Sequence, residues 1–95
     1  MSRVDIEDLS KAEKDITRIF IASSLNEAQS VEEILTGHGI DYAVTIEKYV
    51  RLGLFPSEIP GVAFYVSSVR GSFCRDLLRK EGFLSGIIEE EQEKQ

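Results

Sequence analysis

The chain contains the same strand–helix–strand unit twice, and this repeat limits its possible folds more than any other feature. The first unit has an apolar stretch at 16–22, a helical pattern that starts after Ser24, and an alternating stretch at 40–47. The second unit repeats this order from Val62 to Ile88. Right-handed crossovers leave few ways to combine two such units. We therefore expect an α+β, ferredoxin-like βαββαβ sandwich, in which a four-stranded antiparallel sheet carries two helices on one face.

Helix start and stop signals support this division of the chain. Ser24, with Glu27 three residues later, forms a capping box and predicts that the first helix begins there. Gly39 and Gly82 are each followed by an apolar residue, which is typical of a helix that ends on a left-handed glycine. Apolar residues at helical spacing predict the inner faces of the two helices: Ala28, Val31 and Leu35 in the first, and Phe73, Leu77 and Leu78 in the second.

Composition predicts one domain with charged ends. The 95 residues are 42% hydrophobic, and a chain of this length can bury a core of its own. The net charge of −6 arises from 17 acidic and 11 basic residues, and most of it lies in the two ends. We expect residues 1–15 to be mobile or to form a short helix, residues 16–88 to form the ferredoxin-like domain, and residues 89–95 to form an acidic tail.

Cysteine content and hydropathy predict where the protein resides. Cys74 is the single cysteine, so an internal disulfide cannot form and a reducing compartment suits the chain. No apolar run approaches the roughly 18 to 20 residues of a membrane span, and the N-terminal stretch lacks the apolar segment of a secretory signal. We therefore expect a cytoplasmic protein without a membrane partner.

Residues that could carry catalysis or bind a metal are few. His38 is the only histidine, and no second histidine or cysteine pair stands at metal-binding spacing from it. Cys74 follows Phe73 in the second helical pattern, as a small buried hydrophobe would. Helix capping explains the serines before the helices, and no glycine-rich phosphate loop is present. We expect no enzymatic activity, no metal and no cofactor.

Apolar residues outside the helical faces predict an interaction surface instead. In the expected fold the helices cover one face of the sheet, and we place Phe20, Val62 and Phe64 on the open face. An exposed apolar patch on a small domain usually marks a surface that binds a partner. The segment between Lys48 and Gly61 is bounded by proline and glycine and contributes further apolar residues to this surface: Leu52, Leu54, Phe55 and Ile59. The expected partner is a second copy of the chain, in a homo-oligomer, or another protein.

Part of this pattern is similar to the strand motifs of RNA-recognition domains. Phe20, Ala63 and Phe64 match those motifs, whereas Val62 and Ser67 stand where aromatic residues are expected. The acidic balance of the chain also opposes binding to phosphates. A degenerate RNA-recognition-like domain is therefore an alternative, and nucleic acid is not the partner that we expect.

A further set of motifs lies in the stretch ASSLNEAQSVEEILTGHGIDYAV, residues 22–44, and in VAFYV with the helix after it. Together they resemble a family of small bacterial domains grouped as signal-transducing proteins and akin in structure to the PII nitrogen-regulatory proteins. The family pattern is a strand ending in Ala-Ser, a Leu-x-Glu-Ala helix start, and a leucine-rich helix ending in Gly-Ile. The matching residues here are Ala22, Ser23, Leu25, Glu27, Ala28, Leu35, Gly39 and Ile40. The similarity spans roughly residues 18–82.

This resemblance implies the ferredoxin-like plait and a role in signalling. The second half departs from the family pattern, because SSVRGS replaces an acidic run after the third strand. The glycine and basic motifs with which PII proteins contact nucleotides are not found here. We therefore favour a non-enzymatic module that acts through protein–protein contact, with a sensor of a nucleotide or an organic acid as the alternative.

Overall fold

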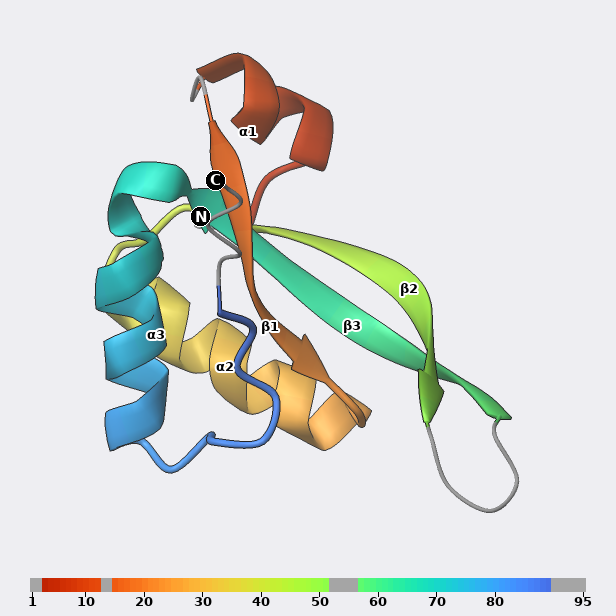
Figure 1. Ribbon diagram of the computed structural model, residues 1–95. Coiled ribbons are helices and arrows are strands. Elements are labelled where there is room, and N and C mark those ends of the chain that lie inside the picture. The colour runs from red at the N-terminus through yellow and green to blue at the C-terminus, as the bar shows by residue number, and fades with distance from the viewer. Residues whose placement is uncertain (1–2, 13–14, 52–56, 90–95) are drawn as a thin grey trace.

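A three-stranded antiparallel sheet with the strand order β1-β3-β2 forms the centre of this α+β domain (Figure 1). The computed structural model describes residues 3–12, 15–51 and 57–89, with only the backbone described for 47–51 and 57–60. No helix in these ranges is both long and apolar enough to cross a membrane. The elements in chain order are α1 (Ile6–Ala12), β1 (Ile16–Ala22), α2 (Leu25–Gly37), β2 (Ala43–Arg51), β3 (Ser57–Ser67), the short 3-10 helix η1 (Ser68–Arg70) and α3 (Gly71–Lys80).

The fourth strand expected over residues 83–88 is reduced to an isolated bridge. Ile87 pairs with Phe20 in an antiparallel bridge beside β1. The backbone amide of Ile21 donates to the carbonyl oxygen of Gly86 at 2.9 Å. β1 therefore has backbone partners on both sides, although the sheet formed by the described residues contains three strands.

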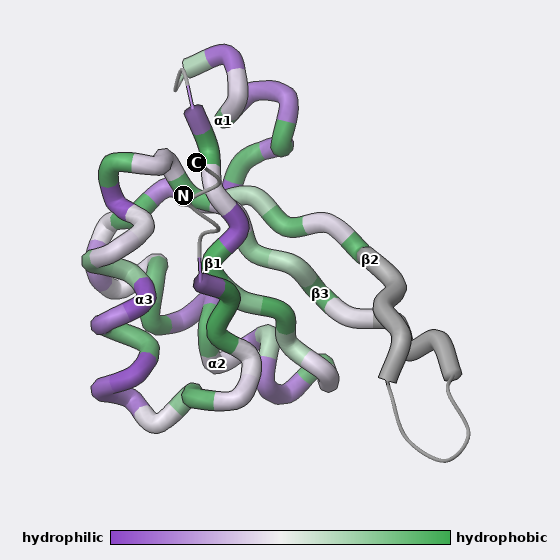
Figure 2. The backbone as a smooth tube through the Cα atoms, in the orientation of Figure 1, coloured by the Kyte–Doolittle hydropathy of each residue, from purple (hydrophilic) through white to green (hydrophobic). Residues whose placement is uncertain are grey.

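The hydrophobic core lies between the sheet and the helices α2 and α3. Phe20 and Phe64 are opposite each other in the register of β1 and β3, and their ring centroids are 6.4 Å apart. α3 alternates between hydrophobic and hydrophilic residues along its length, as expected for a helix with one buried face (Figure 2). The helices add the following buried residues: Ala28, Val31 and Leu35 from α2, and Cys74 and Leu78 from α3.

Phe20 and Phe64 face the helices rather than the open side of the sheet, so their predicted exposure was wrong. Both side chains are 0% exposed. The opposite face of the sheet takes smaller residues such as Ala43 and Ala63, which are also fully buried. The prediction failed because β1 and β3 carry apolar residues on both faces. The alternation of residues along such strands does not identify the face that the helices cover.

The predicted helix ends are confirmed. The amide of Glu27 donates to Ser24 Oγ at 3.1 Å, and the Glu27 carboxylate accepts a hydrogen bond from the amide of Ser23 at 3.0 Å. Gly39 and Gly82 have φ angles of 68° and 94°. After each of these glycines, the next amide donates to the carbonyl five residues earlier, at 3.0 Å in both helices. α2 and α3 thus end in the same motif.

The inner face of α3 differs from the predicted one. Phe73 is 54% exposed, so its predicted place in the core was wrong. Cys74 and Leu78 are fully buried, and Arg75 beside them is only 7% exposed. The helix is therefore rotated so that Cys74 points at the sheet, which confirms the expectation that Cys74 is a buried hydrophobe.

Candidate interaction groove

An apolar groove lies at the end of the sheet where β1 stops and α2 begins. The strand register sets Ala22, Val62 and Ile46 side by side on β1, β3 and β2. Leu25, the first residue of α2, stands beside this row. We call this feature the β1-end groove. Its volume is about 240 Å³, and its lining residues are Ala22, Ser23, Ser24, Leu25, Ile46, Gly61 and Val62.

Two large apolar side chains of the groove are exposed. Leu25 is 74% exposed and Ile46 is 73% exposed. Ile46 lies on the same face of β2 as Val44, which packs against the core. The buried face of α2 begins only at Ala28, so the helix does not cover the strand as far as Ile46. The apolar row of the sheet therefore continues beyond the helix that covers the rest of it.

Polar groups of the β1-end groove already have partners within the helix cap. Ser24 Oγ accepts from the amide of Glu27, and Ser23 Oγ lies 3.4 Å from the Glu27 carboxylate. His38 is at the opposite end of α2, with Nδ1 3.0 Å from the carbonyl oxygen of Ile34. Within the described ranges, no three His, Cys, Asp or Glu residues gather where they could hold a metal ion. The groove can bury apolar side chains, and the hydroxyls of Ser23 and Ser24 are engaged by Glu27.

One residue of the predicted surface, Val62, lines this groove, but its predicted place on the open face was wrong, because it shares the face of Phe64 and packs against the core. Leu52, Leu54 and Phe55 lie outside the described residues, and the side chain of Ile59 in β3 is not described. Sequence reasoning missed Leu25 and Ile46, although both carried a signal. Leu25 directly follows the cap and lies outside the main apolar stripe of its helix, and Ile46 is the last apolar residue of its alternating stretch.

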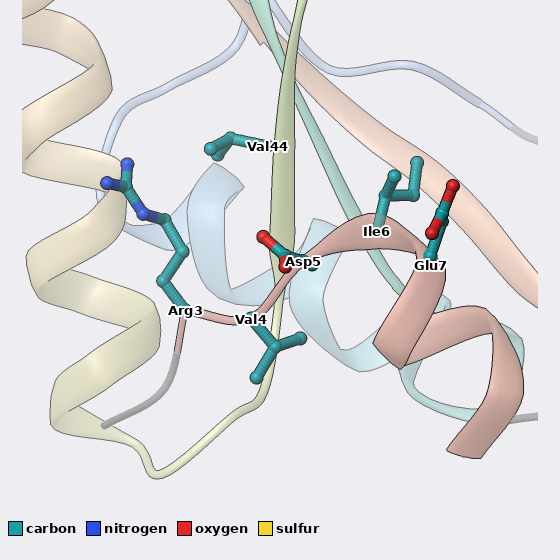
Figure 3. Close-up of a pocket in the computed structure, with 6 residues that line it drawn as sticks. All are labelled: Arg3, Val4, Asp5, Ile6, Glu7 and Val44. Carbon is teal, nitrogen blue, oxygen red and sulfur yellow. The ribbon is translucent and has the colours of Figure 1, made fainter.

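A larger cavity, of about 530 Å³, lies between the start of β2 and the N-terminal segment (Figure 3). Val44 lines it together with the residues from Arg3 to Glu7. The guanidinium of Arg3 is 3.3 Å from the carboxylate of Glu32, which balances its charge. Asp5 and Glu7 then give the lining an acidic balance. An anionic ligand such as a nucleotide or an organic acid is not favoured by these carboxylates.

The thiol of Cys74 gives a prediction about reactivity and pH. Burial raises the pKa of this thiol from 9.0 to about 11. We expect the folded protein to resist a thiol reagent at pH 8 and the urea-unfolded protein to react readily. A folded protein that reacts as fast as the unfolded one would contradict the buried position.

The same shift predicts how the stability falls in alkali. Below pH 9 the thiol is protonated in both states and does not affect the pH dependence of unfolding. Between pH 9 and about 11 the unfolded chain loses the proton first, so the free energy of unfolding declines, by roughly 2 to 3 kcal/mol from this group. Urea titrations across this range measure the decline, and the Cys74→Ala variant should lack the part that the thiol causes.

The resemblance to small bacterial signal-transducing domains rests on helix caps, a helix face and strand starts, which are features of fold.

Comparison with known proteins adds nothing to this resemblance. No protein-family model, curated protein or solved structure matches this chain. Membership in that family therefore stays a prediction from the motifs, and the function has to be argued from the groove itself.

Proposed function

We propose that this protein is a small, non-enzymatic binding or signalling module that acts through protein–protein contact, with the β1-end groove as the contact surface. The observation that carries this proposal is the exposure of Leu25 and Ile46 beside an apolar hollow. Burial of one such side chain stabilises a complex by about 1.5 to 3 kcal/mol relative to its exposed state. Two of them on one small surface favour a partner that buries both.

The partner that fits best is a second copy of the chain. Leu25 and Ile46 protrude beside a hollow that Ala22 and Val62 help to line. In a two-fold dimer each surface patch meets itself, so the protruding side chains of one protomer can enter the hollow of the other.

The finer topology of the sheet is part of the proposal. In the ferredoxin-like fold the last strand pairs antiparallel with the first, outside the order β1-β3-β2. The bridge between Ile87 and Phe20 lies at that position and has that direction. We therefore take residues 83–88 as a shortened fourth strand, which supports the ferredoxin-like plait.

Two other functions fit these observations less well. The rings of Phe20 and Phe64 are buried and cannot stack on RNA bases. The β1-end groove, at about 240 Å³, is smaller than the roughly 300 to 1,000 Å³ of small-ligand sites. The larger cavity beside β2 has an acidic balance, which does not suit the anionic ligands of a PII-like sensor.

The state of the cysteine bears on where the protein resides. A buried free cysteine suits the reducing cytoplasm in which we place the protein.

Sedimentation equilibrium between micromolar and millimolar concentrations tests the proposal. We expect the wild type to dimerise with increasing concentration and the Ile46→Asp variant to weaken the dimer by at least about 100-fold, because each dimer buries the altered residue twice. Val69→Asp is the matched control, since Val69 is 87% exposed on η1, away from the groove. Its dimerisation should match that of the wild type.

Two results would contradict a dimer through this groove. The first is a wild-type protein that stays monomeric throughout the concentration range. The second is an equal loss of dimerisation in the Ile46→Asp and Val69→Asp variants, which would indicate an effect of charge that is independent of the groove. Circular dichroism of each variant establishes that it is folded before its mass is interpreted.

A further inference from the structure

Residues 3–12 start beside Tyr42, directly before β2, and continue as α1 against the sheet; we call them the strap. Arg3 pairs with Tyr42 in a parallel bridge, and the amide of Val4 donates to the carbonyl oxygen of Tyr42 at 2.8 Å. The strap continues into α1, which contacts β2 and β3. The strap thus pairs with the backbone at one position, directly before the start of β2, and leads from there into α1 (Figure 1).

Side chains add two attachments to this backbone pairing. Tyr42 Oη donates to one oxygen of the Glu32 carboxylate at 2.7 Å, and the other oxygen is 3.3 Å from Arg3 Nη1. Glu32 on α2 is therefore the point at which the core holds the start of the strap. Leu9 on α1 is 3% exposed and provides an apolar anchor.

These attachments are weak for a segment of this length. α1 has seven residues, and a helix so short is not stable in water by itself. The side chain of Arg3 is 54% exposed, and exposed ion pairs contribute little to stability. The attachment of the strap thus depends largely on the buried Leu9, with the half-buried Val4 and Ile6, and on one backbone hydrogen bond to Tyr42.

The opposite edge of the sheet is held more firmly. There, the amide of Ile88 donates to the carbonyl oxygen of Ile19 at 2.9 Å, and the amide of Ile21 donates to Gly86. The buried Arg75 binds the carbonyl oxygen of Ile88 and the hydroxyl of Thr17. The two terminal segments therefore flank the same sheet with different strengths.

We infer that the strap opens as a unit while the core stays folded, and that this opening uncovers the backbone at Tyr42, directly before β2. Proteins open locally where few apolar contacts hold a segment, and an uncovered strand edge is available for pairing. The cavity drawn in Figure 3 exists only in the closed state, because all of its lining residues except Val44 belong to the strap. The strap cavity and the β1-end groove share no lining residue, although Val44 and Ile46 are two residues apart on β2, and the opening of the strap does not require dimerisation.

Native-state hydrogen exchange of the full chain, followed by NMR, tests the inference. The amides of Val4 and Leu9 report on the strap, because the first bonds to Tyr42 and the second closes the first turn of α1. We expect these two amides to share one protection factor, at least about 100-fold below that of Ile21. Exchange at Val4 requires the bond to Tyr42 to break, so it measures the uncovering of this backbone directly.

Two variants with matched controls locate the cause. Glu32→Gln should speed exchange at Val4 and Leu9 by about 3-fold to 10-fold and leave Ile21 unchanged, whereas Glu33→Gln on the same helix should change none of them. Leu9→Ala should speed exchange at both strap positions by at least about 30-fold after correction for intrinsic rates. Its control is Leu84→Ala, since Leu84 is 66% exposed.

Several outcomes would overturn the inference. If the amides of Val4 and Leu9 had the same protection factor as the amide of Ile21, the strap would unfold only together with the core. Different protection factors for Val4 and Leu9 would mean that the strap does not open as a unit. Equal acceleration of Ile21 in the Glu32→Gln or Leu9→Ala variant would mean that these residues stabilise the whole fold rather than the strap.

Discussion

Replacing Arg75 with methionine is expected to lower the free energy of unfolding by about 4 kcal/mol. The side chain of Arg75 is 7% exposed. Its Nη2 donates to Thr17 Oγ1 and to the carbonyl oxygen of Arg18, both at 3.0 Å, and its Nε donates to the carbonyl oxygen of Ile88 at 2.5 Å. One guanidinium thus joins α3, β1 and the segment after α3. Methionine fills a similar volume but leaves these acceptors without that donor.

Urea unfolding followed by circular dichroism measures this loss, and two further variants separate its causes. Arg75→Lys keeps the charge but lacks the planar fork, so it should recover less than half of the lost stability. Arg79→Met is the control, because Arg79 pairs with Asp76 and Glu89 at the surface of the same helix. We expect it to cost less than about 1 kcal/mol. Equal losses for Arg75→Met and Arg79→Met would refute the bridging role of Arg75.

Replacing Gly86 with alanine is expected to cost about 3 kcal/mol, which lowers the melting temperature by roughly 15 °C. A Cβ atom at position 86 would lie 2.5 Å from Cζ of Phe20 and 2.6 Å from the carbonyl oxygen of Ile21. Neither neighbour can move easily, because Phe20 is enclosed by the core and Ile21 O belongs to the backbone of β1. The methyl group therefore has to push the segment away from β1 and break its pairing.

Differential scanning calorimetry of Gly86→Ala measures the expected drop. Gly37→Ala is the matched control, since a Cβ at position 37 meets no atom within 4 Å and Gly37 is within α2. Alanine has the higher helix propensity, so this control should be neutral or slightly stabilising. If Gly86→Ala melted at the temperature of the wild type, the close packing of this segment on β1 would be incorrect.

Features that depend on neighbours in sequence could be predicted. The capping box of Ser24 and Glu27 and the helix ends at Gly39 and Gly82 involve residues at most a few positions apart, and all three formed as expected. Cys74 was also placed correctly, because a small apolar residue in the middle of an amphipathic helix usually faces the core.

Features that depend on tertiary packing could not be predicted. Nothing local distinguishes the face of β1 that the helices cover, so Phe20 was assigned to the wrong side. Arg75 has the sequence setting of a solvated residue, and its burial follows from carbonyl groups on segments far away in the chain. Ile46 is exposed because the buried face of α2 does not extend over this part of β2. The position of a helix over a strand depends on tertiary packing, which the spacing of residues in the sequence does not reveal.

The bridge between Phe20 and Ile87 has a consequence for how the protein is made. The ribosome completes β1 early, whereas the segment that flanks its outer edge is synthesised only after both β3 and α3. A nascent chain therefore carries one unpaired strand edge through most of its synthesis, and such edges are prone to associate with other chains. Chaperone binding to the newly made chain should be strongest while this edge is unpaired and should fall once residues 86–88 have paired with β1.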